Sequence, residues 1–258
     1  MPCNSSVQLD IVIPVYNEGR TILRTLAALE SQVKSSFRVL ICYDFDGDDT
    51  LAALNGHRGR SEIRFVKNSG RGPHRAVVTG FESSEAPFVL VYPADDDYNA
   101  GIVDAMVQAA QQGHDVVCAS RFIPGGSMEG CPWLKDILVR MAAVSLYGLA
   151  RMPTHDATNG FRMFSQRLLK KVRIESREGF SYSLELLAKC HRLGWPVAEV
   201  PARWYERTVG KSRFRVLRWL PAYLRWYFYA FATTYLRRGP DSIPTKPESR
   251  SVQKSIVN

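Results

Sequence analysis

The amino-acid sequence predicts an α/β fold in which a mostly parallel sheet is flanked by helices. Three observations predict it. Short β-rich apolar runs alternate with amphipathic helical patterns through the first half of the chain. Acidic residues gather just after two of the predicted strands. The length of 258 residues and the hydrophobic fraction of 45% suit one sizeable globular domain.

The elements of the first half follow one another in a regular order. Five strands are expected, in the segments LDIVIPVY (from Leu9), FRVLICYD, IRFV, PFVLVYP and DVVCAS. Between the first two strands, one helical face carries Ile22, Leu26 and Leu29. Before the fifth strand, Ile102, Met106 and Ala109 mark another helix, which Gly113 ends.

The second half is less regular. We expect a helix over 134–151, a short strand at FRMF, a helix from Tyr182 to Leu193 and a strand at VAEVPA. The predicted organisation is an N-terminal tail, a folded domain, a pair of amphipathic helices and a disordered tail rich in Pro, Ser and Lys, over residues 1–8, 9–213, 214–238 and 239–258.

The segment from Arg203 to Arg238 carries nearly all of the net charge of +9, because it holds nine basic residues and one acidic residue. It also holds 11 of the 28 aromatic residues. Basic and aromatic residues together suit an anionic membrane surface. Two other interpretations stay open: aromatic side chains packing on the core beneath solvated charges, and nucleic-acid binding.

A continuous helix in this segment would be amphipathic. It would place three basic residues on one face and most of the apolar residues away from it, namely Arg215, Arg218 and Arg225 against Leu217, Leu220, Leu224, Phe228 and Phe231. Pro221 is expected to bend or split this helix.

Other features bear on the cellular compartment. The five cysteines have no spacing typical of zinc or a disulfide scaffold, which favours free thiols in the cytosol. The N-terminus, MPCNSSVQLD, lacks an apolar signal region. The longest mostly apolar run, Trp226 to Leu236, is shorter than the roughly 20 residues that span a bilayer. We therefore expect a cytoplasmic protein, bound peripherally to the cytoplasmic face of a membrane.

The acidic clusters predict a site at one edge of the sheet. Asp44, Asp46 and Asp48 follow the second strand, and Asp95 to Asp97 follow the fourth. In open α/β sheets, ligands bind beyond the carboxyl ends of the strands. Asp95 and Asp97 suit Mg²⁺ or Mn²⁺, which would neutralise a nucleotide diphosphate. On its spacing alone, this acidic triplet is a weak signal, since aspartates are frequent in surface turns.

Two further loops at this edge strengthen the prediction. The first strand ends in IPVYNE, where Pro14, Tyr16, Asn17 and Glu18 would frame a base and ribose, and Asp44 would accept hydrogen bonds from the base. The segment GRGPHRAVVTGF is a glycine-punctuated helix start. Together these loops indicate a nucleotide site.

With these motifs in place, the sequence resembles family 2 glycosyltransferases of the GT-A fold, and most of all the polyprenyl-phosphate glycosyltransferase group that includes dolichol-phosphate mannose synthases. The resemblance covers roughly residues 9–215 and rests on seven segments in family order: IVIPVYNE, YDFDGDDT, YPADDD, CASRF, DATNGFR, FSYSLELL with Glu185, and ERTVGKSRF. Three departures stand out. Pro93 replaces the first acid of the metal triplet, His74 replaces a glycine, and Tyr43 and Phe45 alter the second loop.

The resemblance implies roles for particular residues. Asp95 and Asp97 would hold the metal ion, and Asp95, Asp97 and Arg121 would carry catalysis. The nucleotide-sugar would bind at Pro14, Tyr16, Glu18, Asp44, Asp46 and Asp95, and the acceptor phosphate at Arg121, Arg140, Arg207 and Ser212. Asp156 would organise the acceptor loop. We assign no general base, because a lipid phosphate is already an anionic nucleophile.

The implied activity is inverting, metal-dependent transfer of a hexose from a nucleotide-sugar, of the GDP-mannose or UDP-glucose type, to a polyprenyl or dolichyl phosphate. The expected partners are the donor, the lipid phosphate, a membrane surface and, as an option, a membrane protein, with no nucleic acid. Two alternatives stay open: a family 2 enzyme acting on a sugar or small-molecule hydroxyl, and a non-catalytic nucleotide- or nucleic-acid-binding protein.

Overall fold

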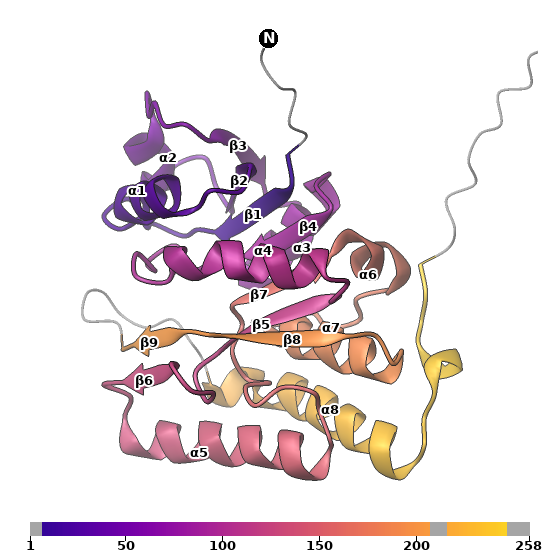
Figure 1. Cartoon of the computed structure of the whole chain (residues 1–258). Helices are drawn as coiled ribbons and strands as arrows, with labels where there is room; N and C mark the ends of the chain where they lie inside the picture. The colour runs from indigo at the N-terminus through magenta and orange to yellow at the C-terminus, as the bar shows by residue number, and fades with distance from the viewer. Residues whose placement is uncertain (1–6, 207–215, 247–258) are drawn as a thin grey trace, which may run out of the picture.

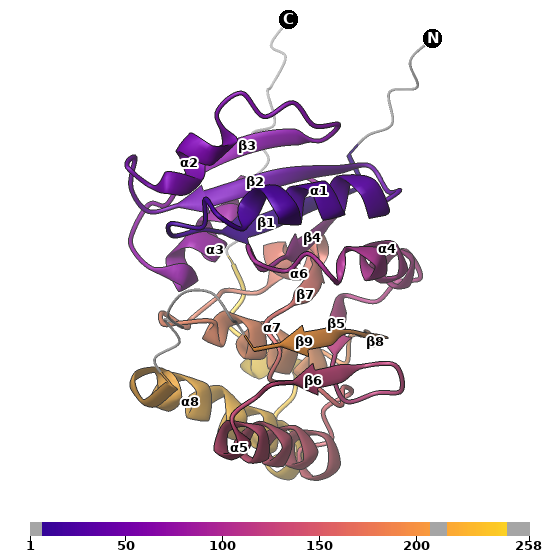
Figure 2. The ribbon, with the colours of Figure 1, turned by 90° about the vertical axis from the view of Figure 1, so that its left-hand side faces the viewer.

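The computed structural model describes residues 7–206 and 216–246, and it contains a seven-stranded sheet of order β3-β2-β1-β4-β7-β5-β8. The strands of this sheet are β1 Leu9–Pro14, β2 Phe37–Tyr43, β3 Glu62–Lys67, β4 Phe88–Val91, β5 Val116–Ser120, β7 Arg162–Ser165 and β8 Val197–Pro201. A separate two-stranded ribbon pairs β6 Ser127–Glu129 with β9 Arg203–Tyr205. Figures 1 and 2 show the sheet from two sides.

The pairing confirms a mostly parallel sheet. β1 lies parallel to β2 and β4, with Ile11 opposite Val39 and Leu90. β7 is antiparallel to both β4 and β5, and it joins the two parallel parts. Because both faces of the sheet are covered, its central strands are almost continuously apolar, as in β1, where Ile11, Val12 and Ile13 are fully buried.

Helices cover both faces. They are α1 Ile22–Gln32, α2 Asp49–Leu54, α3 Pro73–Ser83, α4 Val103–Gln111, α5 Trp133–Val144, α6 Gln166–Lys171, α7 Ser181–Arg192 and α8 Val216–Tyr235. α1 and α4 pack on the face that receives Ile11 and Ile13. α3, α6, α7 and α8 pack on the face that receives Val12. Ile11 and Ile13 face one helical layer and Val12 faces the other, because successive side chains of a strand point to opposite faces of the sheet.

The C-terminal region differs from the sequence prediction in two respects. We expected a pair of helices, with Pro221 bending or splitting the segment, but α8 is one helix that contains Pro221. We also expected disorder over residues 239–258, whereas Pro240–Ser242 form a 3₁₀ turn, Ile243 is buried and Thr245 bridges to Val172. Residues 247–258 of this predicted tail lie outside the described residues. The segment 239–246 is ordered because Ile243 is buried in the core, although the residues around it are mostly polar.

Some of the many aromatic residues of α8 pack against the core of the protein. Trp226 and Ala230 are buried against α7, so part of the aromatic content serves packing. Leu220, Leu224 and Phe228 are exposed. Arg225 lies over the Trp226 ring and pairs with Glu175 at 3.2 Å, while Arg215 and the side chain of Arg218 lie outside the described residues. Within the described chain, no helix is both long enough and apolar enough to cross a membrane.

Candidate active site

The loop after β1 is fixed by the start of α2. The carboxylate of Asp48 accepts hydrogen bonds from the Asn17 amide at 3.0 and 3.1 Å and from the Thr50 amide at 2.9 Å. The Glu18 amide donates to Thr50 Oγ1 at 2.9 Å. Asn17 has a φ of 55°, a conformation that asparagine tolerates better than most residues. β1 ends at Pro14, and Tyr16 and Glu18 therefore lie just beyond the carboxyl end of this strand. Their role in binding a donor stays a prediction.

Asp44 ties the loop after β2 to the loop after β3. Its two oxygens accept from Asn68 Nδ2 at 2.6 Å and from the Gly72 amide at 2.8 Å. Gly72, with a φ of 87°, directly precedes α3. A carboxylate has about four lone-pair sites, so Asp44 retains capacity to accept from a base.

Two further contacts shape this edge of the sheet. The rings of Tyr16 and Phe45 lie 5.4 Å apart, so the loops after β1 and β2 meet through aromatic side chains. Asp46 forms an exposed ion pair with Lys67 at 2.5 Å. The structure thus gathers Tyr16 from the loop after β1 and Asp44 and Asp46 from the loop after β2 at one edge of the sheet.

The three aspartates after β4 differ in environment. Asp96 is buried and accepts from the amides of Tyr98 and Asn99 and from Asn99 Nδ2. Burial raises the pKa of Asp96 to about 6. Asp95 and Asp97 are only partly buried, and Asp97 pairs with Arg24 at 3.2 Å. Asp96 therefore holds the loop in place, while Asp95 and Asp97 on either side of it remain partly accessible to solvent.

The donor set of this loop fits a hard divalent cation. Asp95 and Asp97 offer carboxylate oxygens, the ligands that Mg²⁺ and Mn²⁺ prefer. Arg24, the partner of Asp97, is mostly exposed and can move aside. Among the described residues, no cluster of three or more His, Cys, Asp or Glu side chains is placed to hold a metal ion. A cation here would need phosphate or water as further ligands, as is usual for Mg²⁺.

Arg121 is held in place by the loop before β7. Its guanidinium donates to both oxygens of Asp156, at 2.7 and 2.9 Å, and to Thr158 Oγ1 at 2.8 Å. Asp156 is fully buried. Burial opposes its ionisation, but hydrogen bonds from Arg121 hold the pKa of Asp156 below its usual range. This fork-to-fork pair fixes Arg121 at the end of β5.

Arg140 reaches the same place from α5. The guanidinium carbons of Arg121 and Arg140 lie 5.2 and 5.1 Å from the centre of the Phe122 ring. Arg140 also pairs with Asp136 on its own helix. The structure therefore brings together two of the predicted phosphate ligands through one aromatic ring.

The other two predicted phosphate ligands, Arg207 and Ser212, lie outside the described residues. The segment that leads to them is described. Glu206 pairs with Lys135 of α5 at 3.0 Å, and its amide bonds to the carbonyl of Glu129. The chain thus enters this segment beside the start of α5.

Two residues named from the sequence have internal partners in the structure. His74 is buried, and its Nε2 lies 2.9 Å from Ser176 Oγ. Burial, helped by Arg75, lowers the pKa of His74 to about 4. Glu185 is also buried, where it accepts from Lys189 and from the amides of Glu175 and Ser176. His74 thus joins the segment before α7 to α3, and Glu185 joins the same segment to α7.

Sequence reasoning missed the organising roles of Asp48, Asn68 and Thr158. Asp48 had a readable signal, because it precedes a helix and caps it. Asn68 and Thr158 carried none, since their partners lie 24 and 37 residues away.

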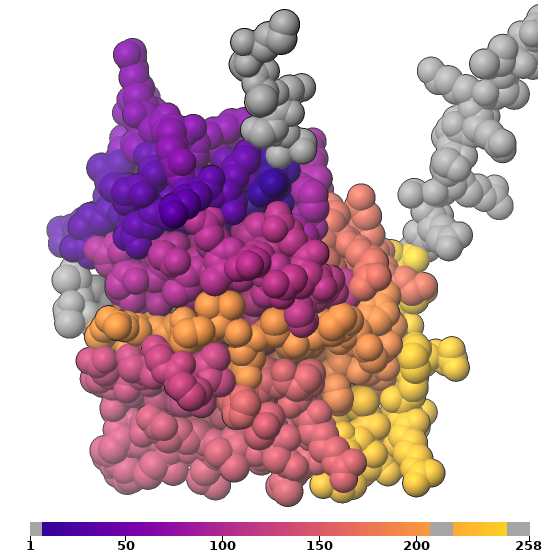
Figure 3. All heavy atoms as spheres, viewed as in Figure 1, coloured from indigo at the N-terminus to yellow at the C-terminus, as the bar shows by residue number. Residues whose placement is uncertain are grey.

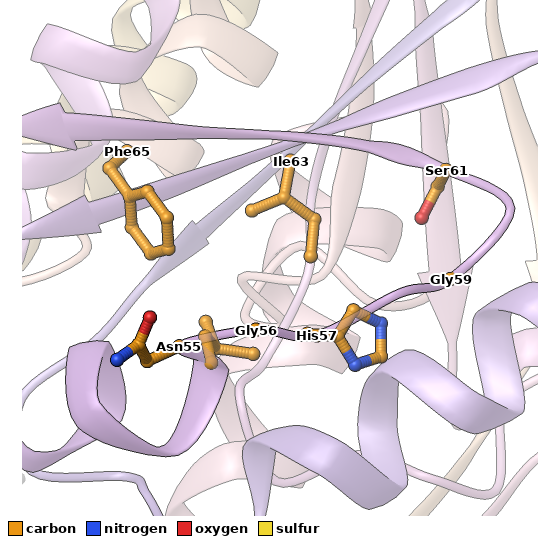
Figure 4. Close-up of a pocket in the computed structure, with 8 residues that line it drawn as sticks. Asn55, Gly56, His57, Gly59, Ser61, Ile63 and Phe65 are labelled. Atoms are coloured by element: carbon orange, nitrogen blue, oxygen red, sulfur yellow. The ribbon is translucent and has the colours of Figure 1, made fainter.

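A hollow of about 300 Å³ lies away from these residues, between β3 and the segment that connects α2 to β3. In Figure 4, Ile63 and Phe65 point from the strand toward the loop that carries Asn55, Gly56 and His57. None of the predicted site residues lines it. It is separate from the candidate active site.

Comparison with known proteins decides the family. Residues 10–173 match the sequence model described as Glycosyl transferase family 2. The chain belongs to this family. This match confirms the family resemblance that the motifs of this glycosyltransferase indicated. Membership of an enzyme family argues against the alternative of a non-catalytic nucleotide- or nucleic-acid-binding protein.

Two curated relatives are similar over most of the chain. A polyprenol monophosphomannose synthase of Mycolicibacterium smegmatis is 26% identical over 211 residues, which cover 79% of each chain. A dolichol-phosphate mannosyltransferase of Pyrococcus furiosus is 21% identical over 232 residues, which cover 85% of this chain and 64% of that protein.

Solved structures show the same fold. A glucosyl-3-phosphoglycerate synthase of Mycobacterium tuberculosis, in complex with Mn²⁺, UDP and glucosyl-3-phosphoglycerate, aligns with a TM-score of 0.62 at 16% identity. The alignment covers 88% of this chain and 80% of that one. The glycosyltransferase thus has the predicted α/β GT-A fold.

Proposed function

We propose that this glycosyltransferase transfers a hexose from a nucleotide-sugar, of the GDP-mannose or UDP-glucose type, to a polyprenyl or dolichyl phosphate, with inversion at the anomeric carbon. The observation that carries the proposal is the convergence of Arg121 and Arg140 on Phe122. Two guanidinium groups gathered on one ring suit an anionic acceptor. The relatives named as polyprenol- and dolichol-phosphate mannosyl enzymes support the same acceptor class.

On the donor side, the loops after β1 and β2 would bind the nucleotide through Pro14, Tyr16, Glu18, Asp44 and Asp46. Asp95 and Asp97 would hold Mg²⁺ or Mn²⁺, which when bound neutralises charge on the departing diphosphate. The buried Asp96 keeps their loop in position through its bonds to Tyr98 and Asn99. The Mn²⁺ in the related synthase structure supports the use of a divalent ion.

On the acceptor side, Arg121 and Arg140, together with Arg207 and Ser212, would bind the lipid phosphate. Asp156 keeps Arg121 oriented through two hydrogen bonds. The phosphate oxygen attacks as an anion and needs no general base, so these residues contribute by aligning it with the sugar and by excluding water.

A membrane surface would present this acceptor. The exposed apolar side chains of α5 include Trp133, Leu134, Leu138 and Met141, which are 74%, 55%, 55% and 64% exposed. α5 and α8 lie together at one end of the molecule in Figures 1 and 2, and Figure 3 shows α5 forming the outer surface there. An exposed apolar patch of this kind marks a membrane or protein contact. We place the enzyme peripherally on the cytoplasmic face.

The test is transfer of radiolabel. Purified protein is incubated with labelled GDP-mannose or UDP-glucose, Mg²⁺ or Mn²⁺, and a polyprenyl phosphate in detergent. Label in the organic extract supports the proposal. Label confined to water-soluble acceptors would favour a hydroxyl acceptor and contradict it. Chelation with EDTA should abolish transfer, and addition of Mn²⁺ should restore it.

A further inference from the structure

A mostly apolar cavity of about 190 Å³ opens beside the two acceptor arginines. It lies between α5 and the loops that follow β5 and precede β7. Its walls are Phe122, Arg140, Ala143, Val144, Tyr147 and His155. Arg140, Ala143 and Val144 lie on one face of α5, and Tyr147 lies in the π-helical segment Ser145–Leu149 that continues it, so this side of α5 is turned toward the cavity.

The polar wall of the cavity is held rigidly. His155 Nδ1 lies 2.7 Å from Glu199 Oε2, and Thr154 Oγ1 donates to the other oxygen of Glu199 at 2.8 Å. The His155 ring stacks on Tyr147, with centroids 3.9 Å apart. A carboxylate and an aromatic ring thus fix the imidazole, and together His155 and Tyr147 form a flat wall.

The cavity adjoins the proposed phosphate site. Phe122 lies against both arginines, and Phe122 and Arg140 both line the cavity. A phosphate held by Arg121 and Arg140 would therefore place its ester substituent at the mouth of an apolar space. An apolar substituent would be stabilised by burial there, because most of the cavity surface is apolar.

We propose that this cavity binds the first isoprenoid unit of the polyprenyl phosphate acceptor. The inference rests on the proposed function and adds where the lipid chain leaves the phosphate site. The size agrees: an apolar cavity of about 150 Å³ accepts benzene, so the cavity beside Phe122 has room for a five-carbon unit. The remaining chain would continue over the exposed apolar side chains of α5 toward the membrane.

The experiment compares two soluble probes, methyl phosphate and dimethylallyl phosphate, whose binding to the purified protein is measured by titration calorimetry or NMR. The wild type should bind dimethylallyl phosphate roughly tenfold to a hundredfold more tightly, because several extra carbons are buried. Ala143→Phe fills the cavity from α5. This substitution should bring the ratio of the two dissociation constants close to one, while the affinity for methyl phosphate stays the same.

Two further variants make the result interpretable. Val144→Trp blocks the same cavity from a residue that is 70% exposed, so it should fold even if the buried Ala143 tolerates no larger side chain. Ala105→Phe introduces the same side chain at an exposed position on α4 and should keep the wild-type ratio. A wild-type ratio near one would overturn the inference, and so would an unchanged ratio in both blocking variants.

The failure of this inference and the failure of the proposed function have different signatures. If the wild type transfers sugar to polyprenyl phosphate but the blocking variants keep the probe ratio, the cavity assignment fails and the proposed function stands. If the wild type transfers sugar to no polyprenyl phosphate, the proposed function itself fails.

Discussion

At the scale of single residues, three consecutive aspartates have two different roles. Asp96 is buried and satisfied by its own loop, whereas Asp95 and Asp97 remain partly accessible at the carboxyl end of the sheet. An acidic run therefore combines a structural anchor with candidate metal ligands. The two roles differ because the turn after β4 directs only the Asp96 carboxylate into the protein interior.

This division can be tested with alanine at adjacent positions. Asp95→Ala should lower turnover by more than about a hundredfold, because charge neutralisation of the diphosphate contributes several kcal/mol. Its melting temperature should stay near that of the wild type. Asp96→Ala should instead lower the free energy of unfolding by about 1–3 kcal/mol, because buried donors lose their acceptor. Full activity in Asp95→Ala would refute the metal assignment.

His74 predicts a pH dependence of stability. Its native pKa of about 4 lies below the value of about 6.5 expected when unfolded, so the unfolded chain binds more protons between these values. The stability that His74 contributes is complete above about pH 6.5 and is lost as the pH falls through about 4.

The measurement is urea denaturation of the wild type and of His74→Asn. From about pH 7.5 to about 4.5, the wild type should lose about 2 to 3 kcal/mol of unfolding free energy relative to the variant. The variant serves as the reference for every other titrating group. A difference that does not change with pH would mean that His74 is not held neutral in the native state.

At the scale of elements, α5 links three features of the molecule. It supplies Arg140 to the proposed acceptor site, lines the cavity beside Phe122 and exposes apolar side chains on its outer surface. α8 supports it, since Tyr227 Oη donates to Ser145 Oγ at 2.8 Å just after α5. Helical periodicity allows one helix to serve all three because its faces point in different directions.

The outer surface of α5 predicts membrane binding. Replacing Leu134, Leu138 and Met141 by Gln should weaken binding to anionic liposomes at least roughly tenfold, since the three side chains no longer gain from leaving water. The melting temperature should change little, because these side chains are exposed. Co-sedimentation with liposomes measures the effect. As a control, Gln108, Gln111 and Gln112 on and after α4 are replaced by Ser.

Unchanged sedimentation of the α5 variant would remove α5 from the membrane contact. The basic residues of the segment from Arg203 to Arg238 would then have to account for any membrane binding.

At the scale of the whole molecule, the C-terminal segment that follows α8 packs back onto the folded domain. Ile243 is buried, the Arg173 amide donates to the carbonyl of Pro244, and the Lys246 amide donates to the carbonyl of Lys171. These contacts fasten the end of α6 to the segment that follows α8. Residues 239–246 are therefore part of the folded domain.

Two truncations separate this segment from the residues beyond it. A chain ending at Arg238 should lose about 2–3 kcal/mol of unfolding free energy, mainly from the burial of Ile243. A chain ending at Lys246 keeps these contacts and should match the full-length protein. Thermal or urea denaturation measures both. Equal stability of the two truncated chains would show that the buried Ile243 contributes nothing.

The sequence by itself determined the alternating strands and helices, the mostly parallel sheet and the edge at which the acidic loops gather. Periodicity and strand-end acids are local patterns, and each reports its own element without knowledge of the rest of the chain. The motif order also indicated the family, which the match over residues 10–173 confirms.

Only the tertiary structure decided which residues meet. It placed β7 antiparallel between β4 and β5, turned Asp96 inward, and set Arg121 and Arg140 against one phenylalanine. It also packed Ile243 into the core from a segment whose composition predicted disorder. These outcomes depend on contacts between residues far apart in the chain. Such contacts are set by how side chains pack in the folded core, and no local pattern encodes them.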